Sequence, residues 1–122
     1  MSKFSEYSTT CRFINMERTD GILQMRLHTD GGPLQWNLDA QVEFVRAFTD
    51  VANDRENRIV ILTGTGHEFS GPRLDPDAPF FHGAKLTPAG VHEVFVNARK
   101  MVNAVLSIEV PMIAAVNGPA KR

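Results

Sequence analysis

Two short apolar segments constrain the fold of this chain most strongly, because each of them runs into a turn that contains glycine. They are "RIVILTG" at residues 58–64 and "PMIAAVNG" at residues 111–118. A β-branched run bounded by charge and Gly is typical of a strand buried on both faces, in a sheet covered by helices. We therefore expect a strand of this kind at residues 58–64 and a second apolar strand from Val110 to Val116, each of which runs into a turn at its carboxyl end.

A helical pattern separates these two strands. Thr87 is expected to cap a helix that has Pro88 at its first position. One wide apolar stripe follows at helical spacing, made of Val91, Val94, Phe95, Ala98, Met101, Val102, Val105 and Leu106. A strand, a helix and a second strand in this order predict a parallel pair joined by a right-handed crossover.

The first half of the chain predicts a hairpin and another helix. Asp20-Gly21 lies between two roughly alternating segments within residues 11–29, and both residues tolerate the positive φ of a tight hairpin turn. Asn37 can cap a helix whose apolar spacing continues to about Asn53. The order strand, strand, helix, strand, loop, helix, strand predicts an α/β fold.

Composition bounds the class of protein. The chain has 122 residues, 43% of them hydrophobic, which suits one globular domain. Its formal charge of −1 and its lack of a Lys/Arg run argue against a nucleic-acid partner. Cys11 is the single cysteine, so no intrachain disulfide forms. With a polar start and no long apolar run, the sequence predicts a cytoplasmic protein with no membrane partner.

Most candidate functional side chains lie in the long segment from Gly64 to about Leu86, and loops of this length tend to be either functional or disordered. No pair in it has the spacing of a metal site, so we expect no metal, and "FSGPR" lacks the second Gly of a nucleophile elbow. "GTG" at residues 64–66 lacks the rest of a dinucleotide or P-loop motif and predicts a strand-exit turn. His92 is expected at the surface of the second helix. The loop candidates are His67, Glu68, Ser70, Arg73, Asp75, Asp77 and His82.

Backbone N–H groups are stronger candidates for binding a ligand than these side chains. If the two apolar strands pair in parallel, their carboxyl ends face one crevice, where open α/β sheets bind ligands. N–H groups from the two turns are then expected to converge on one oxygen atom. Such a pair is an oxyanion hole, which stabilises enolates and tetrahedral intermediates without a charged side chain.

The residue patterns of the two segments resemble those of the enoyl-CoA hydratase/isomerase (crotonase) superfamily. "RIVILTGTGHEFSG" matches its V-V-I-L-T-G-x-G-x-x-F-S pattern, and "EVPMIAAVNGPA" matches P-x-I-A-A-V-N-G-x-A, at about the expected separation. The resemblance spans nearly the whole chain but only the first half of a typical member. It implies a crotonase-like spiral of ββα units, present here as a partial, amino-terminal half, in which two backbone N–H groups hold an enolate.

The resemblance also implies site residues. In the family the first oxyanion donor is the residue before the Asp of F-S/C-A-G-x-D. Counting from Phe69 gives the backbone N–H of Arg73, whereas counting back from Asp75 gives Leu74; Pro72 has no N–H. The second donor would follow Arg122, so residues 1–122 are expected to be an amino-terminal part truncated before it. The residues expected to bind substrate are Ser70, Gly71, Leu74, Asp75 and Gly118.

Two substrate classes fit the resemblance. "LHTDGGPLQWNLDA" at residues 27–40 departs from the "LNRP-x-x-x-NAL" of many CoA-binding members and is similar to the oxocamphor hydrolase branch, which cleaves cyclic β-diketones. The substrate is therefore expected to be a cyclic β-diketone or an acyl-CoA, with no cofactor, and the full-length protein a homo-oligomer. The 122-residue chain alone is predicted to be inactive. The alternatives are a shortened non-catalytic paralogue that acts as a binding or assembly partner, and an incomplete gene product.

Overall fold

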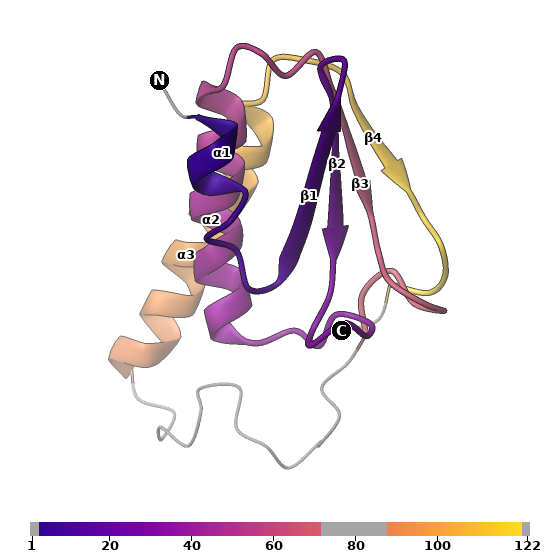
Figure 1. The fold of residues 1–122 in the computed structure, drawn as a ribbon. Helices are drawn as coiled ribbons and strands as arrows, with labels where there is room; N and C mark the ends of the chain where they lie inside the picture. The colour runs from indigo at the N-terminus through magenta and orange to yellow at the C-terminus, as the bar shows by residue number, and fades with distance from the viewer. Residues whose placement is uncertain (1–2, 72–87, 121–122) are drawn as a thin grey trace.

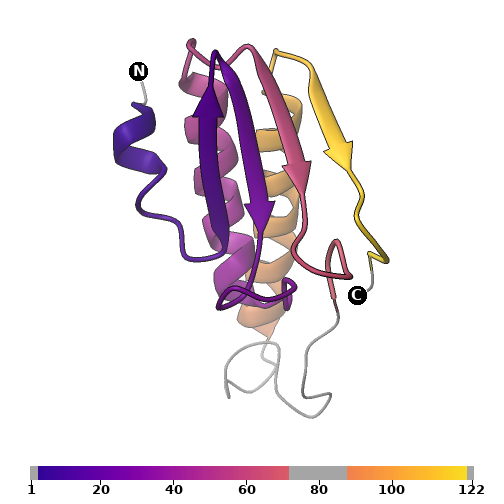
Figure 2. The ribbon, with the colours of Figure 1, turned by 45° about the vertical axis from the view of Figure 1, so that its right-hand side comes forward.

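The fold is one four-stranded sheet with its helices on one side (Figures 1 and 2). The computed structural model of the chain describes residues 3–71 and 88–120. The strands lie in the order β1-β2-β3-β4. The elements are α1 (Phe4–Tyr7), β1 (Ile14–Thr19), β2 (Ile22–Leu27), α2 (Leu38–Asn53), β3 (Ile59–Thr63), α3 (Pro88–Leu106) and β4 (Met112–Ala115).

The predicted hairpin is confirmed. β1 and β2 pair antiparallel, and Thr19 lies opposite Ile22 at the turn. Asp20 and Gly21 have φ values of 52° and 80°, the positive values that a two-residue hairpin turn with the twist of its strands requires. The Gly21 carbonyl also accepts the Arg58 N–H at 2.7 Å, so the hairpin turn fixes the start of β3.

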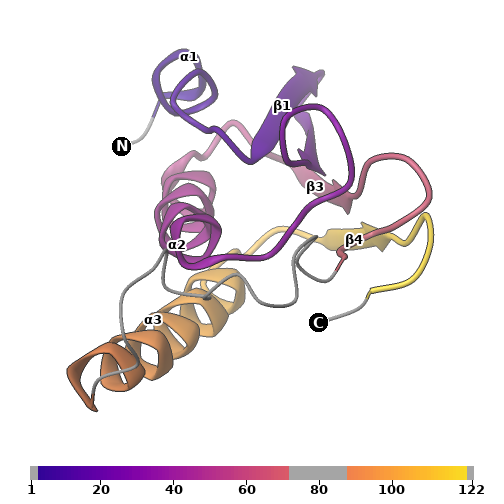
Figure 3. The same cartoon turned by 90° about the horizontal axis from the view of Figure 1, so that it is seen from below.

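The remaining strands pair in parallel, as the sequence predicts. β2 pairs with β3, with Ile22 opposite Ile59, and β3 pairs with β4, with Val60 opposite Met112. Figures 1 and 3 show α2 and α3 on the same face of this sheet. The carboxyl ends of three strands therefore lie at one edge of the sheet.

Helix α2 forms where the sequence places it. The Asn37 side chain accepts the Ala40 N–H at 2.8 Å and caps the helix at its amino end. Its inward face packs on the helix-facing side chains of β1 to β3. The resulting core contains Ile14, Leu23, Met25, Leu27, Leu34, Ala40, Phe44, Ala47, Phe48, Val51 and Val60.

The expectation that β3 is buried on both faces is wrong for the described chain. Only Val60 is fully buried in β3, because α2 and α3 cover one face of the sheet and no described element covers the other. The edge strand β4 is mostly exposed. The apolar stripe of α3 is likewise only partly covered. The large apolar side chains left exposed on and just after these two elements are Phe95, Val102, Leu106, Ile113 and Val116.

A polar network that the sequence did not predict joins the short helix α1 to the loop before β3. The Tyr7 hydroxyl donates to Asp54 at 2.6 Å, and Arg18 donates to Asp54 at 2.7 Å and to Asn57 at 2.9 Å. Burial and the hydrogen bond to Asp54 raise the pKa of Tyr7. Burial also opposes ionisation of Asp54, but hydrogen bonds from Tyr7, the Glu56 N–H and Arg18 outweigh it and lower the pKa of that carboxyl.

None of the helices in residues 3–71 and 88–120 combines the length and apolar character needed to cross a membrane.

The Asp54 network predicts a dependence of stability on pH. Because the folded pKa lies below the ordinary value of 3.8, the network stabilises the fold above about pH 4 and is lost as the pH falls through the folded pKa. Asp54→Asn should lower the free energy of unfolding at pH 7 by about 3 kcal/mol, because it leaves Arg18 without its buried charge partner. Urea unfolding from pH 7 to pH 3 should show a smaller loss of stability in this variant than in the unaltered protein.

The control is Asp30→Asn, which changes an exposed carboxyl at a positive φ that Asn also tolerates. It should leave the pH profile unchanged. Equal acid sensitivity of the Asp54→Asn variant and the unaltered protein would contradict the prediction.

Candidate functional site

The candidate site lies at the sheet edge where β2, β3 and β4 end. Three loops leave the sheet there: residues 28–37 after β2, residues 64–71 after β3 and residues 116–120 after β4. Isolated bridges between Gln35 and Gly71 and between Ser70 and Ala120 continue the parallel pairing beyond the strands. The two glycine-containing turns thus lie side by side, as expected from the sequence.

The side chain of Asn117 holds the two turns together. Its Oδ1 accepts the Gly64 N–H at 3.1 Å. Its Nδ2 donates to the Gly66 carbonyl at 2.9 Å and to the Glu68 carbonyl at 3.1 Å. One amide therefore uses its acceptor and both of its donors on the facing turn, which a carboxylate of the same shape could not do.

The facing turns approach so closely that glycine is required. A Cβ at Gly118 would fall on the His67 carbonyl oxygen, and a Cβ at Gly64 would lie 2.6 Å from the Glu68 carbonyl oxygen. The Glu68 carboxylate similarly occupies the space that a side chain at Gly71 would need. Packing of the turns accounts for these glycines, and a substrate-binding role for Gly71 and Gly118 stays a prediction.

Backbone donors of the loop after β3 are used by the fold. The Phe69 and Ser70 N–H groups donate to the Pro119 carbonyl at 3.0 and 3.4 Å, and the Gly71 N–H donates to the Leu34 carbonyl at 2.8 Å. These three N–H groups therefore hold the loop against its neighbours rather than facing a ligand. The predicted donors Arg73 and Leu74, and with them Asp75, lie outside the described residues and stay predictions.

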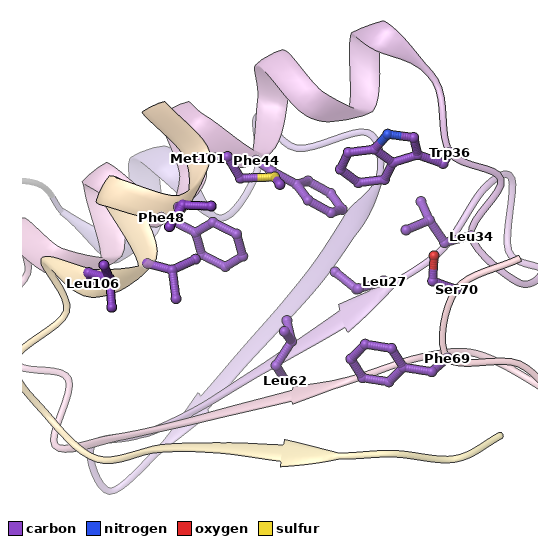
Figure 4. A pocket seen from close by; sticks show the side chains of 12 residues that line it. Leu27, Leu34, Trp36, Phe44, Phe48, Leu62, Phe69, Ser70, Met101 and Leu106 are labelled. Atoms are coloured by element: carbon purple, nitrogen blue, oxygen red, sulfur yellow. The ribbon is translucent and has the colours of Figure 1, made fainter. Parts of the chain in front are cut away.

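An apolar cavity of about 320 Å³ opens between the sheet and the two long helices (Figure 4). Ser70 lines it, and Figure 4 shows Ser70 at the same end as Trp36 and Leu34, with Leu106 and Phe48 at the other end. Of the predicted site residues that the structure describes, Ser70 is the one in this lining. The full lining is Leu27, Leu34, Trp36, Phe44, Phe48, Leu62, Phe69, Ser70, Met101, Val102, Val105 and Leu106.

A second cavity of about 350 Å³ shares a wall with the first. Both are lined by Trp36, Ser70, Met101 and Val102, and the second adds Gln41, Ala98 and Ala120. No charged side chain is among the described residues that line either cavity. Neither Trp36 nor Gln41 is among the site residues predicted from the sequence.

Gln41 is fully buried, and within the described part of the chain neither of its amide atoms has a hydrogen-bond partner. The Trp36 Nε1 atom is also buried without a partner there. A polar residue one turn before Phe44, on the inward face of α2, is the sequence signal that could have identified Gln41.

The other side-chain candidates are not brought together. His67 and His92 are exposed, and the expectation that His92 lies at the surface is confirmed. No group of three His, Cys, Asp or Glu side chains within residues 3–71 and 88–120 is arranged to hold a metal ion. Asp77 and His82 lie outside the described residues.

The Asn117 contacts predict a large effect of a small change. Asn117→Asp keeps the shape but replaces both donors by an acceptor that faces the carbonyls of Gly66 and Glu68. We expect a loss of about 1–3 kcal/mol in the free energy of unfolding, measured by urea denaturation at pH 7. Asn103→Asp, on the exposed side of α3, is the matched control and should change it by less than about 0.5 kcal/mol. Equal effects of the two substitutions would show that Asn117 does not join the turns in solution.

Comparison with known proteins places this arrangement in a family. No protein-family model matches the sequence, and no curated protein matches it either. Among solved structures, a β-diketone hydrolase from the cyanobacterium Anabaena, bound to (S)-3-oxocyclohexyl acetic acid, is 35% identical, with a TM-score of 0.84 over 93% of this chain and 44% of that one.

Two less similar structures show the same fold. An enoyl-CoA hydratase/isomerase from Mycobacterium paratuberculosis has 22% identity and a TM-score of 0.69, over 89% of this chain and 43% of that one. An enoyl-CoA hydratase from Bacillus anthracis has 23% identity and a TM-score of 0.68, over 87% of this chain and 40% of that one. The chain thus spans less than half the length of these relatives. It belongs to the enoyl-CoA hydratase/isomerase (crotonase) superfamily and forms part of the crotonase fold.

Proposed function

We propose that this chain forms part of a crotonase-superfamily enzyme that hydrolyses a carbon–carbon bond of a compact cyclic β-diketone, and that it binds the ring of the substrate. The observation that carries the proposal is the uncharged cavity between the sheet and helices α2 and α3. The 35% identity to a β-diketone hydrolase supports the same substrate class.

The proposed reaction follows from the chemistry of 1,3-diketones. Water adds to one carbonyl carbon, and the bond from that carbon to the carbon between the two carbonyls then breaks. The electron pair of the broken bond moves onto the second carbonyl as an enolate, which takes up a proton to give a keto acid. Backbone N–H groups aimed at the enolate oxygen would stabilise this intermediate, each contributing about 3–4 kcal/mol. The N–H of Arg73, or of Leu74, is the proposed donor from this chain.

The size of the cavity favours a compact ring. A volume of about 320 Å³ lies near the lower end of small-molecule sites. The described lining is uncharged and mostly apolar, which suits a neutral ring. The likeness to enoyl-CoA hydratases is at 22–23% identity and concerns the fold alone. An acyl-CoA is therefore the second candidate substrate.

Trp36 provides a direct test, because it lines both cavities and is the single tryptophan of the chain. Titration with 2,2-dimethylcyclohexane-1,3-dione should change the Trp36 fluorescence and saturate. Crotonyl-CoA at the same concentrations should produce no saturable change. Saturation by crotonyl-CoA alone would favour the acyl-CoA substrate and overturn the diketone proposal.

Filling the cavity should weaken this binding. Val105→Phe places a ring in the lining, so we expect the dissociation constant of the diketone to rise by about ten-fold or more. Val42→Phe makes the same change on the outer side of α2, where Val42 is 48% exposed, and should leave binding within about two-fold. Equal affinities of the two variants would mean that the diketone does not bind in this cavity.

A further inference from the structure

Gln41 is a buried amide at a position that the helix would fill equally well with an apolar side chain. It lies on the inward face of α2 together with Ala40, Phe44 and Phe48, and it has no solvent exposure. Its Oε1 can accept and its Nε2 can donate hydrogen bonds, yet neither atom finds a partner within the described residues.

Such an arrangement is costly for the fold. Leaving a buried polar group unsatisfied costs about 1–3 kcal/mol, whereas Met at the same place would have no such cost. Unpaired buried polar atoms are rare in folded proteins, so each one calls for an explanation, and a functional role is one of them. The amide of Gln41 therefore adds nothing to stability, and Gln41 is a candidate for contact with a molecule in the cavity that it lines.

The surroundings of Gln41 define what that molecule can be. The cavity that it lines has a volume of about 350 Å³ and no charged group in its described lining, so it suits a neutral oxygen. Trp36 and Ser70 belong to both cavities and lie at one end of the apolar one (Figure 4). A ring seated against the apolar lining would thus present an oxygen at this end to the neighbouring cavity.

We propose that Gln41 is a specificity-determining residue whose Nε2 donates a hydrogen bond to a ring carbonyl of the substrate. This inference rests on the proposed function and adds the residue that distinguishes an oxygenated ring from a hydrocarbon ring. Gln41 binds the substrate in this proposal and takes no part in the proton transfers.

The test compares two ligands on three proteins. Trp36 fluorescence is titrated with 2,2-dimethylcyclohexane-1,3-dione and with toluene, a ring without oxygen, in the unaltered protein and in the Gln41→Met and Gln24→Met variants. Met preserves the length of the side chain and removes its hydrogen bonds. Gln24 belongs to β2 and lies half-buried between the fully buried Leu23 and Met25, so its side chain faces the side of the sheet away from the helices.

Gln41→Met should weaken diketone binding by about ten-fold, the equivalent of one hydrogen bond, and leave toluene binding within about two-fold. Its thermal midpoint should equal or exceed that of the unaltered protein, because an unpaired amide has been removed. Gln24→Met should change neither affinity. A lowered midpoint with equal weakening of both ligands would assign Gln41 a structural role and overturn the inference.

The remaining outcomes separate this inference from the proposed function. Unchanged diketone affinity in the Gln41→Met variant would overturn the role of Gln41 while leaving the diketone proposal intact. Failure of the diketone to bind to the unaltered protein, with or without toluene binding, would overturn both.

Discussion

Parallel pairing of β2, β3 and β4 is the constraint on which the rest of this structure depends. Three strands that run in the same direction must end at the same edge, so their exit loops meet there. The described residues of the candidate site lie at that edge or line the cavities between the sheet and the two long helices. The hydrogen bonds of the Asn117 amide and the close approach of Gly118 hold the loop after β4 against the loop after β3.

The cavities lie on the covered side of the sheet. Helices α2 and α3 pack on one face of the sheet (Figure 3). Side chains from the helices, the strands and the exit loops line the space between them, and most of these side chains are apolar. Among the described lining residues, Trp36, Gln41 and Ser70 carry the polar side-chain atoms. An apolar wall with a few polar groups at one end is the usual design of a small-molecule site.

Local signals in the sequence predicted most of the elements. Asp20-Gly21 specified its turn and Asn37 its helix start, because each acts through neighbouring residues alone. The buried network of Tyr7 and Asp54 was out of reach, since it joins residues far apart in the sequence. Burial of β3 was overestimated. An apolar sequence shows that both faces of a strand can be covered, but it does not show whether other elements cover them.

The candidate site was predicted less completely than the fold. The resemblance to the family predicted a binding site in the loop after β3. In the structure, the N–H groups of Phe69 and Gly71 donate hydrogen bonds that hold this loop in place. Gln41 belongs to no sequence motif. The sequence shows only that a polar side chain occupies an inward position of the helix, and this becomes informative once the surrounding cavity is known.

The strand pairing also sets an order of folding events. The β1–β2 hairpin joins residues close in sequence, whereas pairing Ile22 with Ile59 and Val60 with Met112 closes much longer loops before any contact compensates for the lost chain entropy. We expect the hairpin and α2 to form the folding nucleus and β4 to dock last. Substitutions in β4 should then mainly accelerate unfolding, while substitutions at Asp20-Gly21 should slow folding.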